Sequence, residues 1–237
     1  MTRRSMPLVA ALVAGLVTLQ GTAAAQVTAG QVDDFESPGV AGWIVGDPGH
    51  PAPPSNQTSG GPGGAGDGFL LLQSTGLDGP GSRMSAFNTA QWAGDYTAAG
   101  IAGVRLSANN FGPSALSLRL LLADPAGGPP SNAAVSTLAL LLPANSGWTS
   151  LFFPLLPGSL TPVLGTVAGA LSNATELRLF HNPAPVFTGP PNSSPAVLAS
   201  LGIDNVTAVS TVPEPTTLGL LATGALALLV RRRRRRA

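Results

Sequence analysis

Carboxylate and amide side chains gather near both ends of the central part of the chain, where hard oxygen donors could bind a cation. Asp33, Asp34 and Glu36 lie near its start, and Asp204 and Asn205 lie near its end. Such oxygens suit Ca²⁺. If the first and last strands of the fold are neighbours, these side chains converge on one structural calcium ion. The alternative, which stays open here, is that the acidic residues cap turns and strand ends.

A second candidate site is the aromatic segment QWAGDY at residues 91–96. Exposed aromatic rings stack on sugars and neighbouring polar groups bond to hydroxyls, so Trp92, Asp95 and Tyr96 form a possible glycan contact. Aromatic residues make up only 5% of the chain. Each tryptophan, Trp43 and Trp148 included, is therefore also a candidate for the hydrophobic core.

Catalytic residues are harder to find. His50 and His181 are the only histidines, there is no cysteine, and the HExxH and GxSxG motifs are absent. A glycosidase needs two carboxyl groups beside the scissile bond. No spacing singles out a pair among the six candidates, which are Asp33, Asp34, Glu36, Asp95, Glu176 and Asp204. We therefore expect a protein that is not an enzyme, with a carbohydrate-active enzyme as the less favoured alternative.

The charge of the central region excludes one class of partner. Residues 26–211 contain 10 acidic residues and 4 arginines, a net charge of −6, although the whole chain has a formal charge of +1. An acidic domain is a poor match for nucleic acid, so no nucleic-acid partner is expected. The lack of cysteine rules out a disulfide framework, so stability must come from packing or from a metal.

The hydrophobic pattern predicts an all-β domain. Short apolar or alternating runs are separated by Gly, Pro, Asn and Asp, as strands require. These runs span residues 68–73, 101–108, 114–123, 135–142, 148–155, 175–181 and 202–209. Residues 160–173, with Pro162 near their start, predict an internal helix, and residues 47–67 a loop rich in Pro and Gly. We expect one β-sandwich, jelly-roll-like, over residues 26–211.

The N-terminus has the features of a secretory signal peptide. Arg3 and Arg4 precede an apolar stretch at residues 7–19, and three alanines at 23–25 form a small-residue cleavage site. We expect residues 1–25 to be a signal helix that is removed before Gln26.

The C-terminal residues 212–237 predict a membrane segment. Prolines 213 and 215 prevent an earlier helix start, and the apolar run 217–230 forms a helix of about 21 Å, short of the roughly 30 Å hydrocarbon core. Arginines next to a transmembrane helix stay on the cytoplasmic side. A buried core helix and a nucleic-acid patch are the alternatives. The cytoplasmic anchor consists of Arg231, Arg232, Arg233, Arg234, Arg235 and Arg236.

The tail as a whole resembles the PEP-CTERM sorting signal of exported bacterial proteins. The resemblance rests on Pro213, Glu214 and Pro215, the hydrophobic run and the terminal arginines. It implies processing by an exosortase, an inner-membrane-anchored precursor, and a mature form at the cell surface or outside the cell, in bacteria that build exopolysaccharide.

The central region resembles carbohydrate-binding or galactose-binding-like jelly rolls. The resemblance rests on the DDFE opening, the Gly42-Trp43 pair and the closing GIDNV. It implies a structural calcium ion at the acidic residues named above. The function expected is that of a surface or matrix protein with a structural or adhesive role in exopolysaccharide; the alternative is a glycan-binding module.

Overall fold

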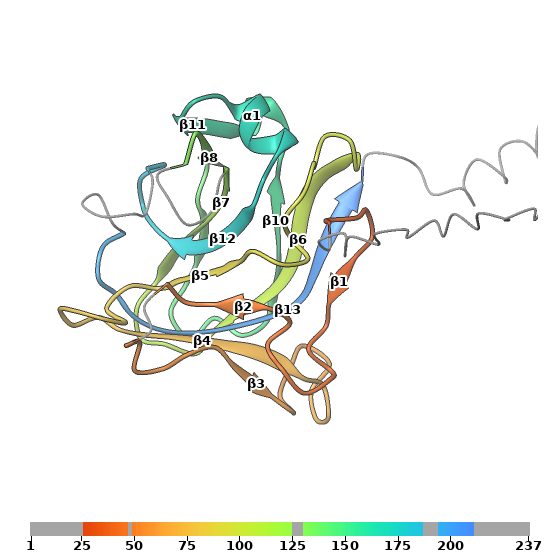
Figure 1. Cartoon of the computed structure of the whole chain (residues 1–237). Coiled ribbons are helices and arrows are strands. Elements are labelled where there is room, and N and C mark those ends of the chain that lie inside the picture. Colours follow the sequence, from red (N-terminus) through yellow and green to blue (C-terminus); the bar gives the residue numbers. More distant parts are fainter. Residues whose placement is uncertain (1–25, 47–48, 125–129, 187–193, 211–237) are drawn as a thin grey trace, which may run out of the picture.

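The computed structural model describes residues 26–46, 49–124, 130–186 and 194–210, and these form two antiparallel β-sheets packed face to face (Figure 1). The all-β sandwich is thereby confirmed. The strands are β1 (Val32–Asp33), β2 (Trp43–Ile44), β3 (Ser55–Gln57), β4 (Phe69–Thr75), β5 (Ser85–Asn88), β6 (Ile101–Asn110), β7 (Leu116–Asp124), β8 (Asn132–Ser136), β9 (Leu140–Leu142), β10 (Thr149–Pro154), β11 (Leu160–Leu164), β12 (Glu176–His181) and β13 (Leu198–Ser210).

Sheet A has the strand order β10-β6-β13-β4-β3, with β1 also paired to β13. Sheet B has the order β11-β8-β7-β12-β5-β2, with β9 also paired to β7. The chain therefore crosses repeatedly between the sheets, and its last described strand, β13, lies inside sheet A between β6 and β4.

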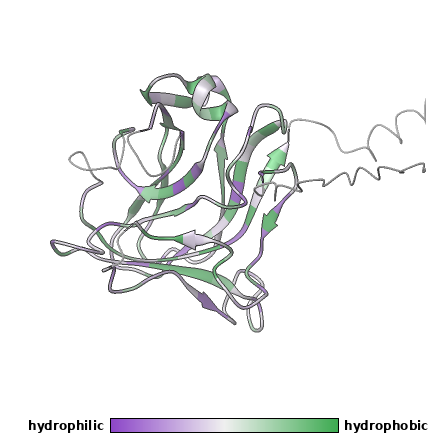
Figure 2. Ribbon diagram, in the orientation of Figure 1, coloured by the Kyte–Doolittle hydropathy of each residue, from purple (hydrophilic) through white to green (hydrophobic). Residues whose placement is uncertain are grey.

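The core between the sheets follows from side-chain alternation along the strands. In β7, Leu116, Leu118, Leu120 and Leu122 share the inner face and are fully or almost fully buried. Figure 2 shows apolar residues along the strands of both sheets, whereas the short strand β3 is hydrophilic. One continuous cluster of aliphatic and aromatic side chains fills the space between the sheets.

The predicted internal helix over residues 160–173 is largely wrong. Its first part is the strand β11, and only Val167–Ser172 form a helix, α1. Pro162 is tolerated because β11 is an edge strand, where a missing N–H breaks no central ladder. The helix begins after Thr166, whose hydroxyl accepts a hydrogen bond from the Gly169 N–H.

Two further expectations differ from the structure in detail. The single run predicted at 135–142 is divided into β8 and β9, and the predicted loop 47–67 contains the strand β3. In the described part of the chain, no helix has the length and apolarity needed to cross a membrane. The expected signal helix (1–25) and membrane helix (217–230) lie outside the described residues.

Candidate functional site

The first and last strands of the sandwich are neighbours, as the calcium hypothesis required. Strand β1 pairs with β13, and Asp33 lies opposite Val206. The carboxylate of Asp33, however, is buried beneath the two core tryptophans. Its Oδ2 accepts hydrogen bonds from Trp43 Nε1 at 2.8 Å and Trp92 Nε1 at 2.7 Å. These bonds occupy the carboxylate, so Asp33 is removed from the calcium candidates.

Asp204 is the most unusual carboxyl group near these strands. Its side chain is 1% exposed, Oδ2 accepts a hydrogen bond from Asn205 Nδ2 at 2.5 Å, and Oδ1 has no partner within the described residues. Burial raises the pKa of Asp204 to about 6, a hydrogen bond from the Asn205 backbone opposes that rise, and the negative charges of Asp67, Glu36 and Asp34 add to it. Burial therefore favours the protonated form of this carboxyl over the charged form.

Asp67 belongs to the same cluster, although the sequence did not single it out. Its carboxylate accepts a hydrogen bond from the Gly63 N–H, and Glu36 Oε1 accepts one from the Gly68 N–H at 3.0 Å. The glycines allow the loop to close tightly, because a Cβ on Gly61 would come within 2.5 Å of Asp67 Oδ2. In the sequence, Asp67 could have been noticed as the acidic residue at the end of a glycine-rich loop. Its relation to Glu36 could not, because Glu36 is far away in sequence.

Carboxylate oxygens of the kind that Ca²⁺ prefers occur on these residues, but they are not gathered into a metal site. Asp204 offers an unsatisfied buried oxygen, and Asp67 and Glu36 offer further carboxylates. Across the described ranges, no group of three or more Asp, Glu or His side chains is already placed to hold a metal ion. Calcium binding by the predicted residues Asp34, Glu36, Asp204 and Asn205 therefore stays a prediction, with Asp67 as a further carboxylate whose charge acts on Asp204.

The proposed glycan contact at residues 91–96 is wrong for its two aromatic residues. The side chains of Trp92 and Tyr96 are 0% exposed, so no sugar can stack on either ring. Tyr96 donates its hydroxyl proton to the Trp92 carbonyl at 2.8 Å. Asp95 accepts a hydrogen bond from the Ala98 N–H, a local turn contact. This segment fills the core, which was the alternative interpretation of the tryptophans.

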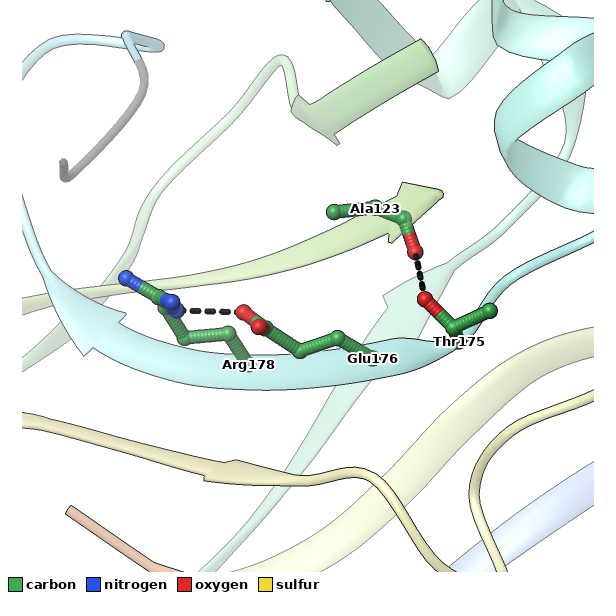
Figure 3. Close-up of polar contacts among 4 residues, drawn as sticks. All are labelled: Ala123, Thr175, Glu176 and Arg178. Carbon is green, nitrogen blue, oxygen red and sulfur yellow. Dashed lines mark hydrogen bonds and ion pairs between the residues drawn. The ribbon is translucent and has the colours of Figure 1, made fainter. Parts of the chain in front are cut away.

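The outer face of sheet B carries a different polar and aromatic group. Arg178 Nε donates to Glu176 Oε1 at 2.6 Å on strand β12, as Figure 3 shows. The Arg178 guanidinium also lies over the Phe87 ring, 5.0 Å from its centroid. Phe87 is opposite Arg178 in register, and Ile44, 44% exposed, is opposite Phe87. Sequence reasoning named Glu176 alone, although the alternation ELRLFH places both charged residues on one face.

Neighbouring contacts hold this face rigid. The Thr175 hydroxyl donates to the Ala123 carbonyl at 3.3 Å at the start of β12 (Figure 3). Further along the sheet, the buried Arg119 guanidinium donates to the carbonyls of Ser136 and Asn182, among others. His181 Nδ1 accepts a hydrogen bond from the Ser117 N–H, and burial lowers the pKa of His181, so it is a neutral structural residue.

Comparison with known proteins identifies the end of the chain. Residues 211–235 match the PEP-CTERM protein-sorting motif. This tail is a PEP-CTERM sorting signal. The expected sorting signal is thereby confirmed, and it implies export. No curated protein matches the chain.

The sandwich that precedes this tail has the fold of known carbohydrate-binding modules. A family 11 carbohydrate-binding module from Clostridium thermocellum, solved with a β-1,3-1,4-mixed-linked tetrasaccharide, is 15% identical, with a TM-score of 0.50; the match covers 79% of this chain and 99% of the module. An exo-β-agarase is 16% identical, with a TM-score of 0.52 over 76% of this chain and 24% of the agarase. These likenesses support the expected jelly roll.

Proposed function

We propose that this PEP-CTERM protein is an exported, non-catalytic carbohydrate-binding protein that attaches to exopolysaccharide at the cell surface. The observation that carries the proposal is the Arg178 guanidinium, which lies over Phe87 and pairs with Glu176 on the outer face of sheet B. Aromatic rings give sugars an apolar surface, and fixed charged groups orient hydroxyls. The shared fold with a module solved in complex with a β-1,3-1,4-mixed-linked tetrasaccharide supports a carbohydrate ligand.

A binding role fits these residues better than a catalytic role. Glycoside hydrolysis uses two carboxyl groups that face the bond to be cleaved. The Asp33 carboxylate is held by core indoles, and Glu176 is 6% exposed and paired with Arg178. Neither is available as one member of such a pair. Arg178, whose side chain is 17% exposed, is the member of the pair that a sugar could reach.

Glycan binding is tested with an array of neutral and acidic polysaccharides probed with the full chain in detergent. We expect saturable binding that Arg178→Lys weakens, because lysine keeps a charge near Glu176 but loses the planar contact with Phe87. Gln73→Ala, at an exposed position of sheet A, is the matched control. Absence of binding to every glycan contradicts the proposal and leaves a structural or adhesive role without sugar recognition.

The sorting step is tested separately. We infer that the precursor is anchored by residues 217–230 with the arginines in the cytoplasm, and that the exosortase recognises Pro213-Glu214-Pro215. Replacement of these three residues by alanine should leave an unprocessed membrane-bound form in the native host, detected by its size and by cell fractionation. Unchanged processing of this variant would refute recognition of the triplet.

A further inference from the structure

We propose that the outer face of sheet A is a second glycan-binding surface, which takes polysaccharides that carry carboxylate groups. The surface consists of Trp148 and Phe111 at one end and of Phe152 and Arg105 at the other. It lies on strands β6 and β10 and the residues next to them, on the opposite sheet from Arg178. The inference does not depend on glycan binding by sheet B.

The first end of this surface is a packed group of three aromatic rings. Trp148 lies edge-on to Phe69 and Phe111, with ring centroids 5.3 and 6.1 Å apart, and Phe111 is 43% exposed. Gly202 forms the floor beneath them, because a Cβ at this position would come within 2.9 Å of both Phe111 and Trp148. The rings can therefore lie directly against the backbone of β13.

The Trp148 indole is also fixed at its polar edge. Its Nε1 donates to the Gly60 carbonyl at 2.9 Å. A ring held by both packing and a hydrogen bond loses little conformational freedom when a ligand binds. Phe111 is exposed and Trp148 is half-buried, so the open part of this rigid group offers a sugar ring an apolar surface.

The second end of the surface carries an arginine that the protein leaves accessible. Arg105 and Phe152 are opposite each other in register, and the guanidinium lies 5.8 Å from the centroid of a ring that is 40% exposed. Phe152 itself covers Gly103, where a Cβ would come within 2.5 Å of the ring. The stacked guanidinium keeps its N–H groups for a ligand, and their fork matches a carboxylate.

The other arginines of the sandwich are engaged by the protein. Arg83 donates to the Ser194 carbonyl, Arg119 donates to buried carbonyls, and Arg178 pairs with Glu176. The Arg105 guanidinium makes no hydrogen bond or ion pair within the described ranges, and the residue is exposed. Among the described arginines, Arg105 is therefore the one whose guanidinium is left to pair with a carboxylate of a ligand, although the net charge of the region, −6, opposes an anion in general.

The distance between the two ends of this surface suits an extended polysaccharide. Phe152 and Trp148 are four residues apart along one strand direction, about 13 Å at 3.3 Å per residue. Ser107 and Ser150 lie between them as a cross-strand pair. Asp204 is opposite Ser107 in register, but its carboxyl group is buried and does not form part of the open surface. Aromatic ends with hydroxyls between them favour a polysaccharide over an apolar protein segment.

The test measures retardation of the full chain in detergent by affinity electrophoresis, with polygalacturonate as the acidic probe and mixed-linkage glucan as the neutral probe. All proteins carry glutamine at positions 231–236, because the tail arginines would bind a polyanion themselves. We expect Arg105→Gln and Phe152→Ala each to weaken binding to polygalacturonate roughly tenfold. Added salt should weaken binding of the parent chain as well.

The outcomes separate this surface from the one on sheet B. Arg178→Lys should leave polygalacturonate binding unchanged, and Arg105→Gln should leave binding of mixed-linkage glucan unchanged. Equal polygalacturonate binding by Arg105→Gln and the parent chain, or no binding by the parent chain, would overturn the inference. Loss of binding in Phe152→Ala alone would also overturn it, because carboxylate recognition requires Arg105. Melting curves confirm that each variant is folded.

Discussion

The carboxylate of Asp33 accepts a hydrogen bond from the Trp92 indole at 2.7 Å, although the two residues are 59 positions apart in sequence. The same oxygen accepts a hydrogen bond from Trp43. One buried anion thus joins the first strand of the sandwich to two large core residues from different segments. The contact explains why an acidic residue near the start of the domain need not bind a metal.

Replacement of Asp33 by leucine should destabilise the sandwich. Two buried indole N–H groups would lose their acceptor, at a cost of about 1–3 kcal/mol each. We therefore expect the free energy of unfolding, measured by urea titration with tryptophan fluorescence, to fall by about 2–5 kcal/mol. The Asp33→Asn variant keeps one acceptor oxygen, so its free energy of unfolding should fall by less than that of the leucine variant. Equal stability of the leucine variant and the parent chain would contradict this role.

Gly202→Ala should disturb the aromatic group on sheet A. The new methyl group would meet Phe69, Phe111 and Trp148 within about 3 Å. Overpacking of this kind costs roughly 1–3 kcal/mol. The same denaturation assay measures it, and Gly158→Ala is the matched control, since nothing lies within 4 Å of its added Cβ. A Gly202→Ala variant as stable as the Gly158→Ala control would show that the rings move aside freely.

Stability should depend on pH through Asp204. The pKa of this carboxyl is about 6 in the folded chain, above its ordinary value of 3.8, so the folded state binds more protons than the unfolded state between these values. Without calcium, the free energy of unfolding should therefore fall as pH rises from about 4 to about 6. Asp204→Asn should remove this fall and stabilise the chain at pH 7 by roughly 1–3 kcal/mol. Identical pH profiles for the two proteins would contradict the prediction.

Bound calcium should restore the folding stability that is lost when the buried Asp204 carboxyl ionises. We propose that Ca²⁺ is held by Asp204, Asp67 and Glu36, so the melting temperature at pH 7 should rise on addition of CaCl₂ and fall with a chelator. Asp67→Asn should weaken the response, whereas Asp78→Asn, an exposed residue, should not. A melting temperature that changes with neither calcium nor chelator would refute the site.

Much of the fold was predictable because strand periodicity is a local property. The runs at 68–73, 101–108, 148–155 and 175–181 correspond closely to β4, β6, β10 and β12. The helix predicted over residues 160–173 was largely wrong because only the second half of this region has a helical pattern. Whether Pro162 lies in an edge strand depends on the order of strands in the sheet, which local sequence does not contain.

The candidate sites were less predictable, because they depend on which face a residue occupies. Strand β1 does pair with β13, the condition that the calcium hypothesis needed, yet the Asp33 carboxylate is hydrogen-bonded to core indoles. A shift of one residue exchanges the faces of a strand, and β13 is irregular between Asp204 and Thr207. The contact of Arg178 with Phe87 joins strands far apart in sequence, so composition and spacing could not reveal it.

Strand β13 ends at Ser210, and the sorting motif begins at the next residue. Tension applied to the tail would therefore enter the sandwich directly through a strand that is hydrogen-bonded to β6 on one side and β4 on the other. Such a pull acts along the strand and loads many interstrand bonds together, instead of peeling them off one at a time. Both neighbouring strands, β6 and β4, would share such a load.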